Sequence, residues 1–151
     1  MKVLIYGLPG SGKSYLAEKV SGYLGDQAVW INADRVREEA NDWDFTDEGR
    51  ARQNARMKSL AEKAELAGKL AICDFVCPTE QGRKDFGADF DVFVDTIAEG
   101  RFQDTNKIFE RPSRPYCFCV TEHNDTDAIE LAGELDELFT RCVNKSEKRA
   151  I

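Results

Sequence analysis

The chain begins with MKVLIYGLPGSGKS (Met1–Ser14), a short apolar run followed at once by a glycine-rich segment. Gly7–Ser14 fits the pattern G-x-x-x-x-G-K-[ST] at every fixed position. In this pattern the glycines let successive backbone N–H groups curl around a β-phosphate, and the following helix adds the positive end of its dipole. The stretch therefore predicts a phosphate-binding loop between a buried strand at Val3–Tyr6 and a helix that starts near Tyr15.

The side chains of this loop point to a nucleoside triphosphate bound with Mg²⁺. Lys13 is the lysine that reaches the β- and γ-phosphates, and the Ser14 hydroxyl takes one Mg²⁺ position. A chance glycine-rich turn is the alternative, but composition alone would rarely place these residues behind an apolar strand. We expect ATP and Mg²⁺ as cofactors, with the nucleotide held by Gly7, Leu8, Pro9, Gly10, Ser11, Gly12, Lys13, Ser14 and Tyr15.

Composition bounds the class of protein. The chain has 151 residues, the size of one ordinary domain, and we expect a single P-loop kinase domain, 1–151. None of its apolar stretches approaches the ~18 residues that span a bilayer, so we expect a cytoplasmic protein that is not associated with a membrane. Its five cysteines form no C-x-x-C pair and are interpreted as small buried hydrophobic residues. A net charge of −7 argues against duplex nucleic acid as a partner. A small-molecule substrate is expected, and a homodimer is compatible with the sequence.

Apolar runs alternate with helical patterns along the chain. The runs predict strands at Lys2–Tyr6, Ala28–Ile31, Leu70–Phe75, Asp91–Asp95 and Tyr116–Thr121. The helical patterns predict a first helix that ends near Leu24, helices near Asp34–Ala40 and Asp47–Ala67, a short helix after Pro78, and a final helix at Thr126–Asn144. This alternation predicts an α/β fold, namely a three-layer P-loop NTPase of the nucleoside-kinase type with a five-stranded parallel sheet. The segment Ile97–Pro115 fits no element.

The last predicted helix carries one apolar stripe, which we interpret as core packing. Its members are Ile129, Ala132, Leu135, Leu138, Phe139 and Cys142.

Polar side chains follow the second and third strands. Asn32-Ala33-Asp34 ends the second strand, and Asp74–Pro78 ends the third. Open parallel sheets bind ligands at the carboxyl ends of their strands. We therefore expect both sets of side chains to face the γ-phosphate held by Lys13.

The helix expected at Asp47–Ala67 changes character along its length. Its apolar stripe, projected back by ~100° per residue, brings Arg50, Gln53 and Asn54 onto the same face. Because an unpaired buried arginine is costly, we interpret this end as lining a water-filled or ligand-filled crevice where Arg50 and Arg56 meet an anion. Solvated residues of a first helical turn are the alternative.

Most of the chain resembles the adenylyl-sulfate kinases, which use ATP to phosphorylate the 3′-hydroxyl of adenosine 5′-phosphosulfate (APS). GLPGSGKS is similar to the phosphate loop of that family. The further matches are NADRVR (32–37) to D-G-D-x-[IV]-R, NDWDFT (41–46) to N-x-D-L-G-F-S, Arg50 and Arg56 to R-x-E-N-I-R-R, DFVCP (74–78) to A-F-I-S-P, Arg83 to an arginine five residues on, and VFVDT (92–96) to V-F-V-D-T.

The resemblance implies a role for each matching residue in a kinase of sulfate assimilation. Asp34 would orient or deprotonate the acceptor hydroxyl, and Lys13 would be the second catalytic residue. A cap of the following helix is the alternative reading of Asp34. The acceptor would be bound by Arg37 and Arg50 at its phosphosulfate, by Phe45 at its adenine, by Gln53, and by the backbone of Phe75, Val76, Cys77 and Pro78 on the opposite wall.

The chain departs from the family pattern at three places. Asn32 replaces the first acid of D-G-D, and Cys77 replaces the serine of A-F-I-S-P. The lid motifs K-G-L-Y-K-K-A-R and F-T-G are missing, and a shorter segment, Glu99–Phe109, stands in their place. In that segment the candidates for stacking on a base are Phe102 or Phe109, and those for bridging phosphates are Arg101 or Lys107.

These departures keep two other functions open. The same chemistry with another acceptor, such as a different nucleotide, a nucleic-acid end or a small hydroxyl metabolite, is suggested by the altered lid. A nucleotide-binding regulatory protein with little turnover is suggested by Asn32 and by the shortened lid. Intact Lys13, Ser14 and Asp34 argue against the regulatory protein.

Overall fold

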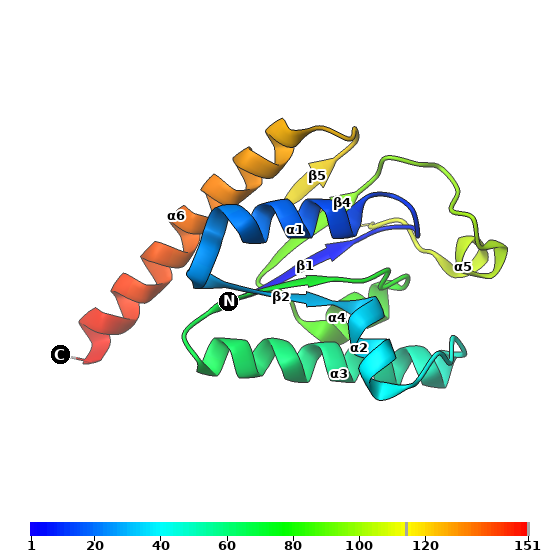
Figure 1. Cartoon of the computed structure of the whole chain (residues 1–151), viewed down its shortest axis with the longest axis horizontal. Helices are drawn as coiled ribbons and strands as arrows, with labels where there is room; N and C mark the ends of the chain where they lie inside the picture. Colours follow the sequence, from blue (N-terminus) through cyan, green and yellow to red (C-terminus); the bar gives the residue numbers. More distant parts are fainter. Residues whose placement is uncertain (114, 151) are drawn as a thin grey trace.

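A five-stranded, all-parallel sheet lies at the centre of the computed structural model, which describes residues 1–113 and 115–150 (Figure 1). Arg114 and Ile151 lie outside the described residues. The strand order is β2-β3-β1-β4-β5, and the strands are β1 (Lys2–Tyr6), β2 (Ala28–Asn32), β3 (Leu70–Asp74), β4 (Phe90–Val94) and β5 (Phe118–Val120). The predicted α/β fold is confirmed. β5 is shorter at both ends than the predicted Tyr116–Thr121.

Helices cover both faces of the sheet (Figure 1). One face carries α1 (Lys13–Leu24) and α6 (Asp125–Ala150), and the other carries α2 (Ala33–Ala40), α3 (Asp47–Leu66) and α4 (Glu80–Phe86). A short 3₁₀ turn, η1 (Gly25–Gln27), connects α1 to β2. Within the described residues, no helix combines the length and the apolarity needed to cross a membrane.

The segment 97–115 contains one helix that sequence reasoning did not assign, α5 (Gln103–Ile108). It lies beyond the carboxyl ends of the strands (Figure 1). The Asn106 side chain closes the segment onto itself, because Nδ2 donates to Gly100 O at 2.8 Å and Oδ1 accepts from Gly100 N at 2.8 Å. This local clamp orders a stretch that has no apolar period.

The core has two parts because successive side chains of β1 point to opposite faces of the sheet. Val3 and Ile5 pack under α1 and α6, whereas Leu4 and Tyr6 pack under α3 and α4. Burial of these side chains on both faces is what makes the strands read as continuous apolar runs.

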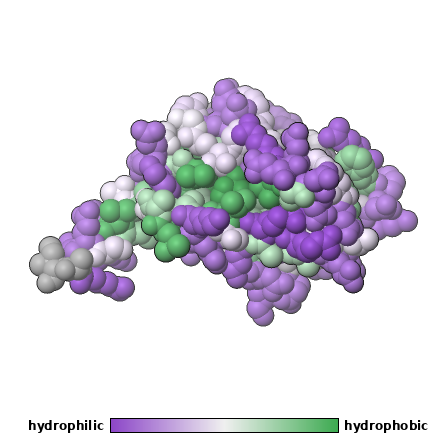
Figure 2. Space-filling view, turned by 60° about the horizontal axis from the view of Figure 1, so that its bottom comes forward, coloured by the Kyte–Doolittle hydropathy of each residue, from purple (hydrophilic) through white to green (hydrophobic). Residues whose placement is uncertain are grey.

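The predicted stripe of α6 is partly wrong. Ile129 is 57% exposed and Cys142 is exposed, whereas Ala128 and Leu131 are buried together with Ala132 and Leu135. The C-terminal part of α6 projects past the body of the molecule (Figures 1 and 2), so no core reaches Cys142. The cysteine prediction is likewise only half correct: Cys73 and Cys77 are buried, Cys119 is half-buried, and Cys117 and Cys142 are exposed.

Candidate active site

The phosphate loop runs from the carboxyl end of β1 into α1 (Figure 1). Gly10 and Gly12 have φ angles of 83° and 98°, values that only glycine adopts readily. Gly12 is also the N-cap residue of α1, and it has no side chain that could bond the first N–H groups of the helix. The positive end of α1 therefore faces the interior of the loop, where an anion is stabilised.

Lys13 is held inside this loop. Its side chain is 9% exposed, and Nζ donates a hydrogen bond to Leu8 O at 2.9 Å. Burial lowers the pKa of Lys13 to about 8, and the negative charges of Asp74 and Asp34 oppose that shift. The positive charge of the Lys13 ammonium group is thus only weakly compensated by the protein, which suits a residue that binds phosphate oxygens.

Asp74 ends β3, where the sequence predicts side chains that face the γ-phosphate, but sequence reasoning assigned it no role of its own. Its carboxylate is 2% exposed, and Oδ1 accepts hydrogen bonds from Ser14 Oγ at 3.2 Å and from Asn32 Nδ2 at 3.0 Å. Its Oδ2 accepts from Trp30 Nε1 at 2.5 Å. Burial raises the pKa of Asp74 to about 6, although these donors and Lys13 act in the opposite direction. The available signal was an acid that ends an otherwise apolar strand.

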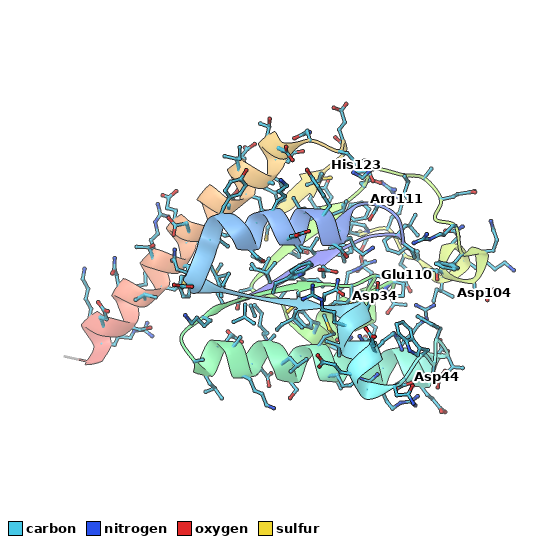
Figure 3. All side chains as sticks on the ribbon, in the orientation of Figure 1. Asp34, Asp44, Asp104, Glu110, Arg111 and His123 are labelled. Atoms are coloured by element: carbon cyan, nitrogen blue, oxygen red, sulfur yellow. The ribbon has the colours of Figure 1, made fainter. Side chains whose placement is uncertain are left out.

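Asn32 and Asp34 share the start of α2. The Asn32 side chain caps the helix by accepting from Arg35 N at 3.1 Å, so the alternative in which Asp34 is the cap is wrong. Asp34 lies in the first turn of α2, and its charge acts on Lys13 (Figure 3). The ends of β2 and β3 thus meet at the phosphate loop.

Three of the residues expected to bind the acceptor form a second group, with Arg37 on α2, Phe45 on the loop that follows it and Arg50 on α3. Phe45 is 54% exposed, and the guanidinium carbons of Arg37 and Arg50 lie 4.3 and 5.5 Å from its ring centroid. Arg37 Nη1 donates to the backbone oxygens of Asp42 and Asp44, and Arg50 Nε donates to Phe45 O at 2.9 Å. Burial lowers the pKa of both arginines, which indicates guanidinium groups short of nearby negative charge.

Arg56 and Gln53 stabilise this loop from beneath. Arg56 Nη1 lies 2.9 Å from Asp42 Oδ2, while Nη2 donates to Gln53 Oε1 at 3.0 Å. Gln53 is buried, and its Nε2 donates to Ala33 O at 3.0 Å. The anion that Arg56 meets is therefore the carboxylate of Asp42 in the same chain. The hydrogen bonds from Arg52 and Arg56 hold the pKa of Asp42 well below its usual range.

The opposite wall, Phe75–Pro78, is closed by Arg83. This buried arginine donates from Nε to Cys77 O and from Nη2 to Pro78 O, both at 3.1 Å. Phe75 packs edge-on against Phe86 in the core, and Val76 is half-buried. Burial raises the pKa of Cys77 to about 12. The carbonyls of Cys77 and Pro78 are thus engaged by the protein itself.

The short segment that replaces the family lid presents its two phenylalanines differently. Phe109 stacks on Phe93 with centroids 6.2 Å apart, and the Arg83 guanidinium lies 5.4 Å from its ring. Phe102 is exposed, with Arg101 5.4 Å from its centroid. Between this segment, the phosphate loop and the end of β4 is a cavity of about 250 Å³, lined among others by Leu8, Phe93, Asp95, Asn106, Phe109 and Arg111.

Two of the charged groups at this cavity pair with each other. Arg111 donates from Nη1 and Nη2 to the two carboxylate oxygens of Asp95, at 2.9 and 2.7 Å. Arg111 and Glu110 lie on the inner side of the segment, whereas Asp104 on α5 points outward (Figure 3).

The chain resembles known proteins both in sequence and in fold. A sequence model of the family described as "Adenylylsulphate kinase" matches residues 1–112. The bifunctional enzyme NodQ of Azospirillum brasilense is 30% identical over 164 aligned residues, which cover 89% of this chain and 26% of that enzyme. The chain thus spans about a quarter of the length of the curated relative.

Solved structures agree with this match. The Mycobacterium tuberculosis APS kinase CysC in complex with AMPPNP and APS is 25% identical, with a TM-score of 0.65 over 92% of this chain and 96% of that one. Shikimate kinase from Aquifex aeolicus is 17% identical, with a TM-score of 0.60 over 91% of this chain and 97% of that one, a likeness of fold alone.

Proposed function

The chain belongs to the adenylylsulfate kinase family, and on that premise we propose that it transfers the γ-phosphoryl group of ATP to the 3′-hydroxyl of APS. It is a phosphotransferase that uses ATP. The observation that carries the choice of acceptor is the position of Phe45, whose exposed ring is flanked by Arg37 and Arg50. An aromatic face beside two guanidinium groups suits a purine nucleotide with a polyanionic end.

On the donor side, the phosphate loop binds ATP through its backbone N–H groups and Lys13. The oxygen groups of Ser14 and Asp34 fit Mg²⁺, a hard cation that prefers such ligands, and Ser14 is the residue that we assign to it. When bound, Mg²⁺ neutralises charge on the β- and γ-phosphates. Lys13 stabilises the charge that develops on the transferring group, because its ammonium is preorganised in a buried site.

On the acceptor side, Asp34 orients the 3′-hydroxyl of APS and accepts its proton. Asp34 suits this role because it lies in the first turn of α2, two residues after the end of β2, and within electrostatic reach of Lys13. Phe45 stacks on the adenine of APS, and Arg50 binds the phosphosulfate. Arg37 positions Phe45 as well as facing the acceptor, because it also binds the loop carbonyls of Asp42 and Asp44. Gln53 acts indirectly, by joining α3 to the start of α2.

The experiment is an assay of ADP formation with purified protein, MgATP and a panel of acceptors: APS, 5′-AMP, shikimate, gluconate and an oligonucleotide. Lys13→Ala protein, prepared in the same way, controls for contaminating kinases. The proposal requires that APS give the highest kcat/KM of the panel. ADP formation with another acceptor but not with APS would show that this family member has changed its substrate, and the altered segment Glu99–Phe109 would be the place to seek the cause. A cytoplasmic location, a homodimer and a role in sulfate assimilation stay predictions.

A further inference from the structure

Asp74 is a buried carboxylate to which the roles above assign no task. It is the last residue of β3, and its partner in the register of the sheet is Asn32, the last residue of β2. It is 2% exposed and lies within 3.2 Å of Ser14 Oγ. An ionised carboxylate in such a place is unfavourable unless charge or hydrogen bonds compensate it.

The hydrogen bonds around Ser14 set the direction in which its hydroxyl points. The hydroxyl has one proton and two lone pairs. Its proton goes to Asp74 Oδ1 at 3.2 Å, and one lone pair accepts from Asn32 Nδ2 at 3.2 Å. The second lone pair is left for a ligand outside this group, which is the arrangement that a cation on the phosphate side requires.

Asp74 is itself held in place by three donors. Oδ1 accepts from Ser14 and Asn32, and Oδ2 accepts from the indole of Trp30 at 2.5 Å. These three hydrogen bonds fix the orientation of the carboxylate. The carboxylate of Asp74 therefore lies in a fixed orientation beside the hydroxyl that we assign to Mg²⁺.

The sequence pattern of the family places the carboxylate on the neighbouring strand instead. Where D-G-D begins with an acid this chain has Asn32, and where A-F-I-S-P begins with alanine it has Asp74. Because the two positions are register partners on adjacent strands, the carboxylate has moved across one strand and stays beside the same hydroxyl.

We propose that Asp74 is a positioning residue that orients the Ser14 hydroxyl toward Mg²⁺ and supplies, from β3, the negative charge that the family pattern supplies from position 32. The proposal rests on the proposed function only in that the protein binds ATP with Mg²⁺. It is independent of the acceptor.

The test measures the affinity of the β,γ-imido analogue of ATP by calorimetry, once with Mg²⁺ and once with EDTA. No acceptor is present, so the result does not depend on whether APS is the substrate. For Asp74→Ala we expect the affinity gain caused by Mg²⁺ to fall by ~10-fold or more. In EDTA the same variant should bind the analogue equally well or more tightly, because a negative charge near the phosphates has been removed.

Three further variants separate positioning from structure. Trp30→Phe removes one donor but keeps the carboxylate, and it should retain most of the Mg²⁺ gain. Asp74→Asn keeps the volume and should behave like Asp74→Ala, which guards against a folding defect in the alanine variant. The exchange Asn32→Asp with Asp74→Ala restores the order of the family pattern and should regain the Mg²⁺ dependence lost in Asp74→Ala.

Two results would overturn the proposal. One is an equal loss of affinity with Mg²⁺ and with EDTA in both Asp74 variants, which would make Asp74 a structural residue. The other is an exchange variant whose Mg²⁺ gain stays as low as that of Asp74→Ala although its thermal unfolding is normal.

Discussion

The ring of His123 lies directly against Gly12 of the phosphate loop. A Cβ atom added at Gly12 would come 2.6 Å from His123 Cε1 and 2.8 Å from Nδ1. His123 belongs to the connection between β5 and α6, so the far edge of the sheet helps to enclose the loop (Figure 3). At Gly10, which also has a positive φ, an added Cβ would meet no atom within 4 Å.

These two glycines form a matched pair for the first prediction. Both Gly10→Ala and Gly12→Ala carry the strain of a positive φ, but only Gly12→Ala adds a clash with a ring. We expect Gly12→Ala to lower the free energy of unfolding by ~1–3 kcal/mol more than Gly10→Ala does, as overpacked sites typically do. Chemical denaturation measures this difference. The double variant Gly12→Ala with His123→Ala should have a free energy of unfolding close to that of Gly10→Ala. If His123→Ala restores no stability, the contact between Gly12 and His123 is unimportant.

The second prediction follows from the lowered pKa of Lys13. With a pKa of about 8 in the free protein, Lys13 is largely neutral at pH 8.5. Phosphate oxygens favour its charged form and raise this pKa, so the nucleotide must bind with uptake of protons, ~0.7 per site at that pH. The affinity of the protein for the nucleotide should therefore fall as the pH rises above 8. Calorimetry in buffers of different ionisation enthalpy measures the uptake, which Lys13→Ala should abolish; buffer-independent heats in the wild type would refute the prediction.

The third prediction concerns Arg50. Arg50→Ala should raise the KM for APS by ~10-fold or more, since a charge-assisted hydrogen bond is worth about 1.5–3 kcal/mol, while the KM for ATP barely changes. Steady-state kinetics with each substrate varied in turn gives both constants.

Arg52→Ala is the matched control for Arg50→Ala. Arg52 lies on the same helix but pairs with Asp42 and Asp44. Both partners have a second contact that would remain, since Arg56 also pairs with Asp42 and Arg37 also donates to Asp44 O. Exposed ion pairs contribute little, so the KM for APS should stay within ~2-fold in this variant. Equal effects of the two substitutions would indicate that Arg50 only orders the loop.

The fourth prediction is that Cys77 takes no part in the reaction. Burial raises the pKa of its thiol to about 12, so it is neutral at any working pH, and in-line transfer needs no covalent intermediate. Cys77→Ser should keep its activity within ~3-fold. In the native protein a thiol reagent should label the exposed Cys117 and Cys142 but leave Cys77 unmodified until the protein unfolds. Rapid labelling of Cys77 with parallel loss of activity would contradict this.

The sequence predicts the part of the structure that depends on local pattern. Apolar runs, helical periods and the fixed positions of the phosphate loop suffice to place the five strands, the main helices and Lys13 and Ser14. The stripe of α6 is displaced because Ala128 is small and weakly apolar, whereas Ile129 looks like a core residue but faces solvent. Helix α5 is held by hydrogen bonds between Asn106 and Gly100, which leave no hydrophobic signal.

The rest of the site depends on pairings between distant segments. Asp74 becomes significant only once the register of β2 and β3 sets it beside Asn32 and Ser14. In the sequence Arg56 looks like a residue that binds a ligand anion, but in the structure it pairs with Asp42, 14 positions away. Such contacts follow from tertiary packing, and a single sequence carries no direct signal of them.

The most direct test of the central claim is the identity of the product formed from MgATP and APS. ³¹P NMR of the completed reaction should show ADP and, in equal amount, a new phosphomonoester signal coupled to the 3′-proton of the ribose of APS. Both signals should be missing with Lys13→Ala protein, because a preorganised charge of this kind is worth at least ~10²-fold in rate. ADP without a new phosphomonoester, or a phosphoryl group at another position of APS, would contradict the proposed reaction.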